Sequence, residues 1–104
     1  MSQEEETYLA IGHKMEGAVQ SQMFGKPCFK VNGKAFMSLF DNQLAFKLSG
    51  EAHLEALSLD GSKRFDPSGK RPMKEWVQVP FHYADKWEEF AREALEYVRF
   101  GTTN

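Results

Sequence analysis

The dipeptide Asn32-Gly33 lies between two strand-like segments, and few topologies can accommodate it there. Both residues tolerate a positive φ, and a two-residue loop of this kind is typical of a tight β-hairpin. Asp41-Asn42 is a weaker turn of the same type, followed by a third strand-like segment. The two turns predict an antiparallel three-stranded meander over residues 23–31, 34–40 and 43–48. Gly25 is expected to mark an irregular start or bulge in its first strand.

Two-residue loops also predict the register of this meander. They place Cys28 opposite Met37, Phe29 opposite Phe36, and Met37 opposite Phe46. Side chains alternate between the two faces of a strand. One face is then almost wholly apolar on the second and third strands, and we predict that it forms the core, with Cys28, Ala35, Met37, Leu39, Leu44, Phe46 and Leu48.

The opposite face of the meander is predicted to carry Phe29, Phe36 and Phe40. Aromatic side chains on an open sheet face commonly mark an interface. These three residues are therefore candidates for association with a second copy of the chain or another protein. The alternative is that a helix or loop of the same chain covers them.

Helical patterns flank the meander. Ser2 and Glu5 have the spacing of a capping box, and the apolar stripe of the helix that follows is predicted to be Tyr8, Ile11, Met15, Ala18 and Val19. Ser49 is suited to cap a short helix that runs to about Leu57. Asp85 and Glu88 begin a last helix, which has an apolar side and a charged side.

Two further strands are predicted between the last two helices. They are an edge strand at Lys63–Phe65 and a strand from Met73 to Val79 that Pro80 ends. The order becomes α-β-β-β-α-β-β-α. This order predicts an α+β fold of two layers, with helices on one face of an antiparallel sheet.

Composition sets the class of protein. The 104 residues suit one domain over residues 1–104, and 41% of them are hydrophobic, as expected for a packed globule. The single cysteine, Cys28, precludes an internal disulfide, and the acidic N-terminal segment is unlike a signal peptide. We therefore expect a cytoplasmic protein. The apolar runs are too short for a bilayer, so no membrane association is expected.

Catalytic and metal-binding patterns are absent from the sequence. His13, His53 and His82 lack metal-ligand spacing, so we predict no metal and no cofactor. Cys28 is expected to be a small buried hydrophobe rather than a nucleophile. The glycines match neither a phosphate-binding loop nor a dinucleotide fingerprint. We assign no catalytic residue; the sequence favours a non-enzymatic role and leaves an enzyme as the alternative.

A basic segment is the best candidate for binding. Lys63, Arg64, Lys70, Arg71 and Lys74 stand against one acid, Asp66. We predict an anion site that involves Arg71, Lys47, Lys70 and Arg64. The alternatives are a solvated loop that protects a sheet edge, and nucleic-acid binding through residues 63–74. The net charge of −2 argues against nucleic acid.

The order of several short motifs resembles the TfoX N-terminal domain-like family over about residues 20–100. These motifs are Met23-Phe24-Gly25, Gly33-Lys34-Ala35-Phe36, Leu44-Ala45-Phe46-Lys47, Phe65-x-Pro67, Gly69-Lys70-Arg71-Pro72-Met73, Trp76 and Val79-Pro80. The resemblance implies a two-layer fold similar to that of secretion chaperones. It implies no catalytic residues, and the competence regulators that name the family usually carry a further domain.

These observations predict a small, non-enzymatic interaction or regulatory module that forms a homodimer through its open sheet face or an edge strand. One alternative is an enzyme or binder that acts on a phosphorylated or acidic small molecule near Arg71 and Lys47. Another is weak nucleic-acid binding through residues 63–74.

Overall fold

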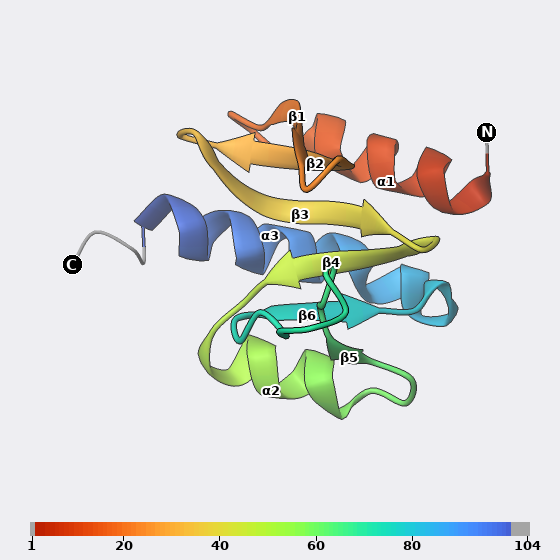
Figure 1. Cartoon of the computed structure of the whole chain (residues 1–104). Helices are drawn as coiled ribbons and strands as arrows, with labels where there is room; N and C mark the ends of the chain where they lie inside the picture. The colour runs from red at the N-terminus through yellow and green to blue at the C-terminus, as the bar shows by residue number, and fades with distance from the viewer. Residues whose placement is uncertain (1, 101–104) are drawn as a thin grey trace.

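The protein has an α+β architecture, seen in a computed structural model that describes residues 2–100 (Figure 1). The predicted fold class is confirmed. The elements in chain order are α1 (Gln3–Lys14), β1 (Val19–Met23), β2 (Lys26–Val31), β3 (Lys34–Phe40), β4 (Gln43–Lys47), α2 (Gly50–Ser58), β5 (Lys63–Arg64), β6 (Trp76–Val79), the 3₁₀ turn η1 (Phe81–Tyr83) and α3 (Ala84–Phe100).

The strands form one antiparallel sheet in the order β1-β2-β3-β4-β6-β5. All three helices contribute side chains to the same core, and α3 runs behind β3 and β4 in Figure 1. The opposite face of the sheet has no helix over it among the described residues. The chain between β5 and β6 crosses part of that face, as Figure 1 shows. We call it the open face.

The segment predicted as one strand over residues 23–31 contains the last residue of β1, a two-residue turn and the whole of β2. Phe24 and Gly25 form its turn, both with positive φ (55° and 75°), and Met23 pairs with Lys26. The prediction was wrong because a phenylalanine seldom adopts the left-handed conformation that this turn requires. Val19 consequently lies in β1 and not on the stripe of α1, which ends at Lys14.

A β-bulge in β3 changes the predicted register. Phe29 pairs with Met37 and Lys30 pairs with Ala35, so Phe36 is an extra residue on β3. The extra residue lets Phe36 and Met37 both enter the core beneath the helices. Cys28 pairs with Ser38, not Met37. The predicted pairs that place Phe29 opposite Phe36 and Cys28 opposite Met37 are therefore wrong.

Beyond the bulge, the predicted register is correct. Met37 pairs with Phe46 and Leu39 pairs with Leu44, as the Asp41-Asn42 turn implied. Both turn residues have positive φ, at 57° and 59°. Leu44, Phe46 and Leu48 lie in the main core as expected.

Helix α1 approaches the sheet very closely. The Ser2 hydroxyl accepts a hydrogen bond from the Glu5 backbone N–H at 3.0 Å, which confirms the predicted cap. A Cβ atom at Gly12 would lie 2.1 Å from the ring of Phe29. Only glycine therefore fits at this crossing. Tyr8, one turn earlier on α1, also contacts this ring, with 5.2 Å between ring centroids.

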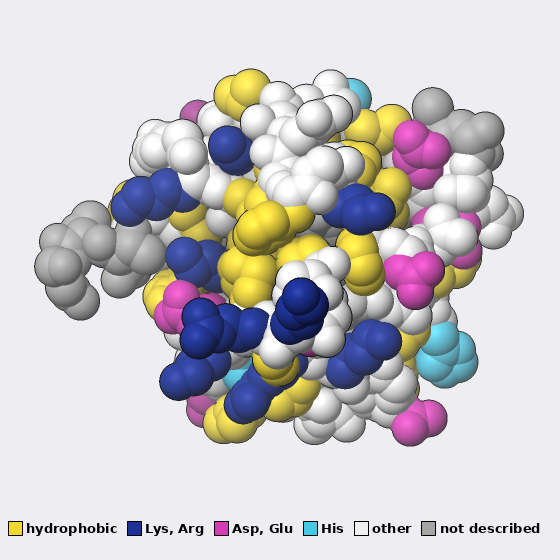
Figure 2. Space-filling view, viewed as in Figure 1, with side chains coloured by type: hydrophobic (Ala, Val, Ile, Leu, Met, Phe, Trp, Pro, Cys, Tyr) yellow, Lys and Arg dark blue, Asp and Glu magenta, His cyan; other side chains and the backbone are white. Residues whose placement is uncertain are grey.

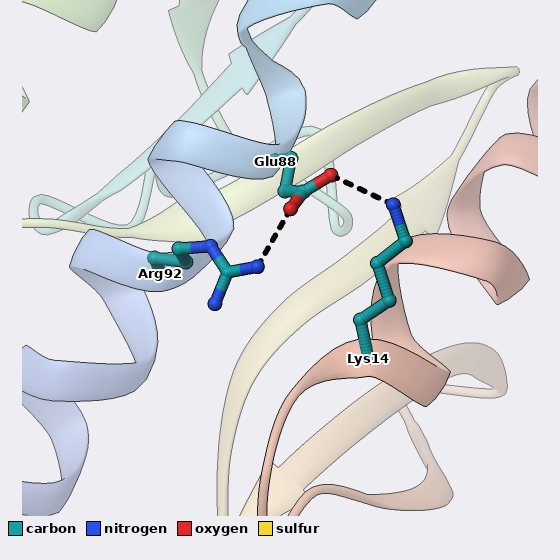
Figure 3. A network of polar contacts seen from close by, with 3 residues as sticks. All are labelled: Lys14, Glu88 and Arg92. Atoms are coloured by element: carbon teal, nitrogen blue, oxygen red, sulfur yellow. Dashed lines mark hydrogen bonds and ion pairs between the residues drawn. The ribbon is translucent and has the colours of Figure 1, made fainter.

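Charged side chains join α1 to α3 (Figure 3). Glu88 accepts hydrogen bonds from Lys14 Nζ at 3.1 Å and from Arg92 Nη2 at 2.6 Å. The hydrogen bond from Arg92, followed by that from Lys14, lowers the pKa of Glu88. The three side chains thus tie the end of the first helix to the first turns of the last. Within residues 2–100, the helices are too short or too polar to cross a bilayer.

Candidate functional site

Charge is divided unevenly between the two layers of the protein. Residues 19–47 and 63–79, which hold the strands and the loop before β6, contain nine of the thirteen basic residues and three of the fifteen acidic ones. The remaining segments, mostly helical, contain four basic and twelve acidic residues. A net charge of −2 therefore conceals a sheet layer of +6 and a helical layer of −8. An acidic ligand would be attracted to the sheet layer.

The open face combines basic side chains with an apolar strip. Figure 2 shows lysine and arginine side chains gathered around a central apolar area on the face seen in Figure 1. Beneath this area lies a second hydrophobic cluster, separate from the main core, that contains Ala45, Phe65 and Trp76 with Met23, Ala35, Phe40 and Met73 at its margin. Phe40 contacts Phe65, which contacts Trp76 in turn, with ring centroids 5.3 Å and 5.7 Å apart.

The loop between β5 and β6 is held down on this face. The Phe65 N–H donates to the Trp76 carbonyl at 3.1 Å, and the Met73 N–H donates to the Phe65 carbonyl at 2.9 Å. His53 of α2 contacts the Lys74 carbonyl through its Nε2 at 2.9 Å. These contacts fix both ends of the loop, so the backbone that carries its basic residues has a defined place.

Asp66 organises the tip of the same loop. Its Oδ1 accepts hydrogen bonds from the Gly69 N–H at 2.8 Å, the Ser68 hydroxyl at 3.2 Å and the Arg71 N–H at 3.3 Å. Gly69 has a φ of +75°, which suits glycine. The one acid of the basic segment is thus used by the turn that presents Lys70 and Arg71.

Arg71 and Lys47, both predicted to bind an anion, line one hollow. We call this space of about 620 Å³ the Arg71 hollow; its other lining residues are Pro72, Met73, Lys74, Glu75 and Trp76. Trp76 is 5% exposed and contributes an apolar wall. Three cations face one carboxylate here, which suits a ligand with more than one negative charge.

Glu75 partly offsets the positive charge of the Arg71 hollow. Its Oε1 lies 3.8 Å from Lys47 Nζ, and its Oε2 accepts a hydrogen bond from the Tyr97 hydroxyl. That hydrogen bond raises the pKa of Tyr97. Because the Lys47–Glu75 pair is loose, Lys47 can turn toward a stronger anion at little cost.

A second hollow lies on the other side of Pro72. We call this space of about 470 Å³ the Lys63 hollow; it is lined by Phe40, Lys63, Arg64, Asp66, Gly69, Pro72 and Gln78. Arg64, the fourth predicted residue, therefore lies apart from Arg71 and Lys47. Gln78 is buried and its Nε2 donates to Gln43 Oε1 at 2.7 Å. Lys70 is exposed at the loop tip.

The predicted aromatic patch is largely absent from the open face. Phe29 and Phe36 are buried in the main core because of the bulge, and Phe40 alone lies on the open face, half-buried. The predicted placement of Phe29 and Phe36 is therefore wrong. Lys26 Nζ lies 5.3 Å from the centroid of the Phe40 ring, within the range of a cation–π contact.

Cys28 is buried as predicted, but beneath the open face, where it pairs with Ser38 and Ser21. Burial raises the pKa of its thiol, and Lys30 opposes this only in part. A thiol with a raised pKa is a poor nucleophile. Among the residues that the structure describes, no group of His, Cys, Asp or Glu is arranged to hold a metal ion.

Sequence reasoning missed the contribution of Lys26 and Lys30 to the open face. Cys28 lies on the open face, so Lys26 and Lys30, two positions away from it on β2, lie on that face too. The pattern of alternation contained this signal, but the wrong face was assigned to Cys28. The sequence predicted that Trp76 lies on a strand but gave it no part in a site. It lines the Arg71 hollow only because the loop before β6 folds back over the sheet.

Comparison with protein-family models, curated proteins and solved structures finds no match for this chain. The resemblance to the TfoX N-terminal domain-like family therefore stays a prediction from the sequence motifs.

Proposed function

We propose that the protein is a small binding module that captures an oxyanion ligand, a phosphate or polycarboxylate, in the Arg71 hollow. The observation that carries this proposal is the convergence of Arg71, Lys47 and Lys74 on one hollow with an apolar wall. Arginine supplies two parallel donors to an oxyanion, and lysine adds charge without fixed geometry. Recognition of such a ligand suits a regulatory or interaction protein, and the lone buried thiol suits a cytoplasmic location.

Single-stranded nucleic acid is a weaker candidate for the same face. Basic residues beyond the hollow, such as Lys26 and Lys30, would follow a phosphate backbone. Base stacking needs accessible rings, however, and Phe65 and Trp76 are buried. We therefore favour a compact anion.

Binding is tested by titrating the protein with inorganic pyrophosphate and, separately, with citrate, and recording the fluorescence of Trp76. A Trp87→Phe background leaves this tryptophan as the sole one in the chain. We expect Arg71→Ala and Lys47→Ala each to weaken binding by about tenfold or more. Arg71→Lys should lose less than Arg71→Ala. Glu75→Gln should tighten binding, because it removes the opposing carboxylate.

The control variant is Arg92→Ala, which removes one positive charge from α3, away from the open face. It should bind as the parent does. If neither anion binds, the proposal fails. It also fails if Arg92→Ala weakens binding as much as Arg71→Ala does, because the effect would then follow net charge rather than the hollow.

A further inference from the structure

Strand β1 is an exposed edge without the usual protection. It is an outer strand of the sheet, and its five residues, Val19–Met23, include no charge and no proline. Natural edge strands are commonly short, charged or interrupted, which prevents pairing with other chains. The other edge, β5, follows that rule with two residues that are both basic. The contrast suggests that β1 has a strand to pair with.

The sequence of β1 is nearly symmetric about its central residue, Ser21. Gln20 and Gln22 stand on either side of it, and the apolar residues Val19 and Met23 stand at the ends. An antiparallel pair of two β1 strands centred on Ser21 would place amide beside amide and apolar side chain beside apolar side chain. Polar side chains opposite polar ones, and apolar opposite apolar, stabilise the pairing of two strands.

The free backbone groups of β1 match this register. The two-residue turn at Phe24-Gly25 makes Met23 and Lys26 a hydrogen-bonded pair, and bonded pairs alternate along an antiparallel ladder. The N–H and C=O groups of Gln20 and Gln22 therefore point away from β2. In the symmetric pairing, Gln20 of one copy faces Gln22 of the other, and the two such pairs form four hydrogen bonds.

Exposed apolar side chains lie at both ends of the same edge. Val19 is 64% exposed, and Phe24, in the turn, is 66% exposed. The symmetric register brings Val19 of one copy against Met23 of the other, with Phe24 next to that pair. Each copy would thereby cover the exposed apolar side chains of the other, as expected of an interface with two-fold symmetry.

We propose that two copies of this chain form a homodimer by antiparallel pairing of their β1 strands, centred on Ser21. The two six-stranded sheets become one twelve-stranded sheet. The two-fold axis stands perpendicular to the sheet, so both open faces point to the same side. This inference does not depend on anion binding in the Arg71 hollow.

The symmetry supplies a test that a simple loss of folding cannot imitate. Ser21 meets its own copy, so Ser21→Lys and Ser21→Glu each place two like charges opposite one another. We expect each variant alone to weaken the dimer by about tenfold or more. An equimolar mixture of the two places Lys opposite Glu, and should restore a heterodimer.

The measurement is sedimentation velocity of the full chain over a concentration series, with one variant carrying a tag so that the mixed species has a distinct mass. Ser21→Thr is the matched control and should dimerise as the parent does. A parent protein that stays monomeric at the highest concentration overturns the proposal. The β1 edge would then be free to pair only with a strand of a different protein. A Ser21→Lys variant that dimerises as tightly as the parent, or a mixture of folded variants that stays monomeric, overturns it too.

Discussion

Gly12 shows how one missing side chain fixes the distance between two layers. In an exposed helix, Gly→Ala stabilises by about 1 kcal/mol. Here the added Cβ would meet the Phe29 ring at 2.1 Å, so either the ring or the helix must move. The cost of overpacking a core, roughly 1–3 kcal/mol, exceeds the gain in helix propensity.

We therefore predict that Gly12→Ala lowers the free energy of unfolding, measured by urea denaturation. Phe29→Leu shortens the side chain that obstructs the new Cβ. In that background, Gly12→Ala should cost less than in the parent. A Gly12→Ala variant more stable than the parent would show that α1 can shift away from the sheet without penalty.

Among the strands and helices, those next to recognisable turns were predicted best from the sequence. Asn32-Gly33 and Asp41-Asn42 each have both residues at positive φ, and the strands beside them lie close to where the sequence placed them. The Phe24-Gly25 turn has the same shape with an unusual first residue, so propensity alone could not find it. The bulge at Phe36 turns two consecutive side chains, Phe36 and Met37, into the core shared with α3. That contact is distant in sequence, so local alternation could not predict it.

The candidate site follows the same division. Arg71 and Lys47 were identified by their residue type and neighbours, and they line one hollow. Arg64 was grouped with them through sequence proximity, but Pro72 and the fold of the loop separate the two hollows. Position along a loop therefore predicted its basic character without predicting which cations act together.

The junction of α1 and α3 should respond to pH through Glu88. Contacts with Arg92 and Lys14 lower its pKa in the folded state, so the folded protein binds a proton at this site less readily than the unfolded chain does. Glu88 thus contributes stability above its unfolded pKa of about 4.3. That contribution is lost as the pH falls through the folded pKa.

We predict that Glu88→Gln lowers the melting temperature at neutral pH, and that the difference from the parent shrinks as the solution is made acidic. The effect should be small, because the three side chains are partly exposed. Glu89→Gln removes the same charge from the next position of the helix, outside the Lys14–Glu88–Arg92 contacts. Equal losses for the two variants would contradict the prediction.

For the molecule as a whole, the separation of charge predicts behaviour that the net charge does not. A protein of net charge −2 should pass through a sulfonate cation exchanger at pH 7. We expect this one to be retained at low salt, because its sheet layer can meet the resin alone. Arg71→Ala should elute at lower salt than Arg92→Ala, although both variants have the same net charge. If the two variants elute at the same salt concentration, the sheet layer is not the surface that binds the resin.

The same separation of charge gives the molecule a large electric dipole, directed from the helices toward the sheet. Near a negatively charged ligand or surface, this dipole produces a torque that turns the sheet layer toward the negative charge before contact. The protein would then be oriented before contact, and fewer encounters would occur through its acidic helical side. Added salt shortens the range of that torque and would slow capture more than it speeds release.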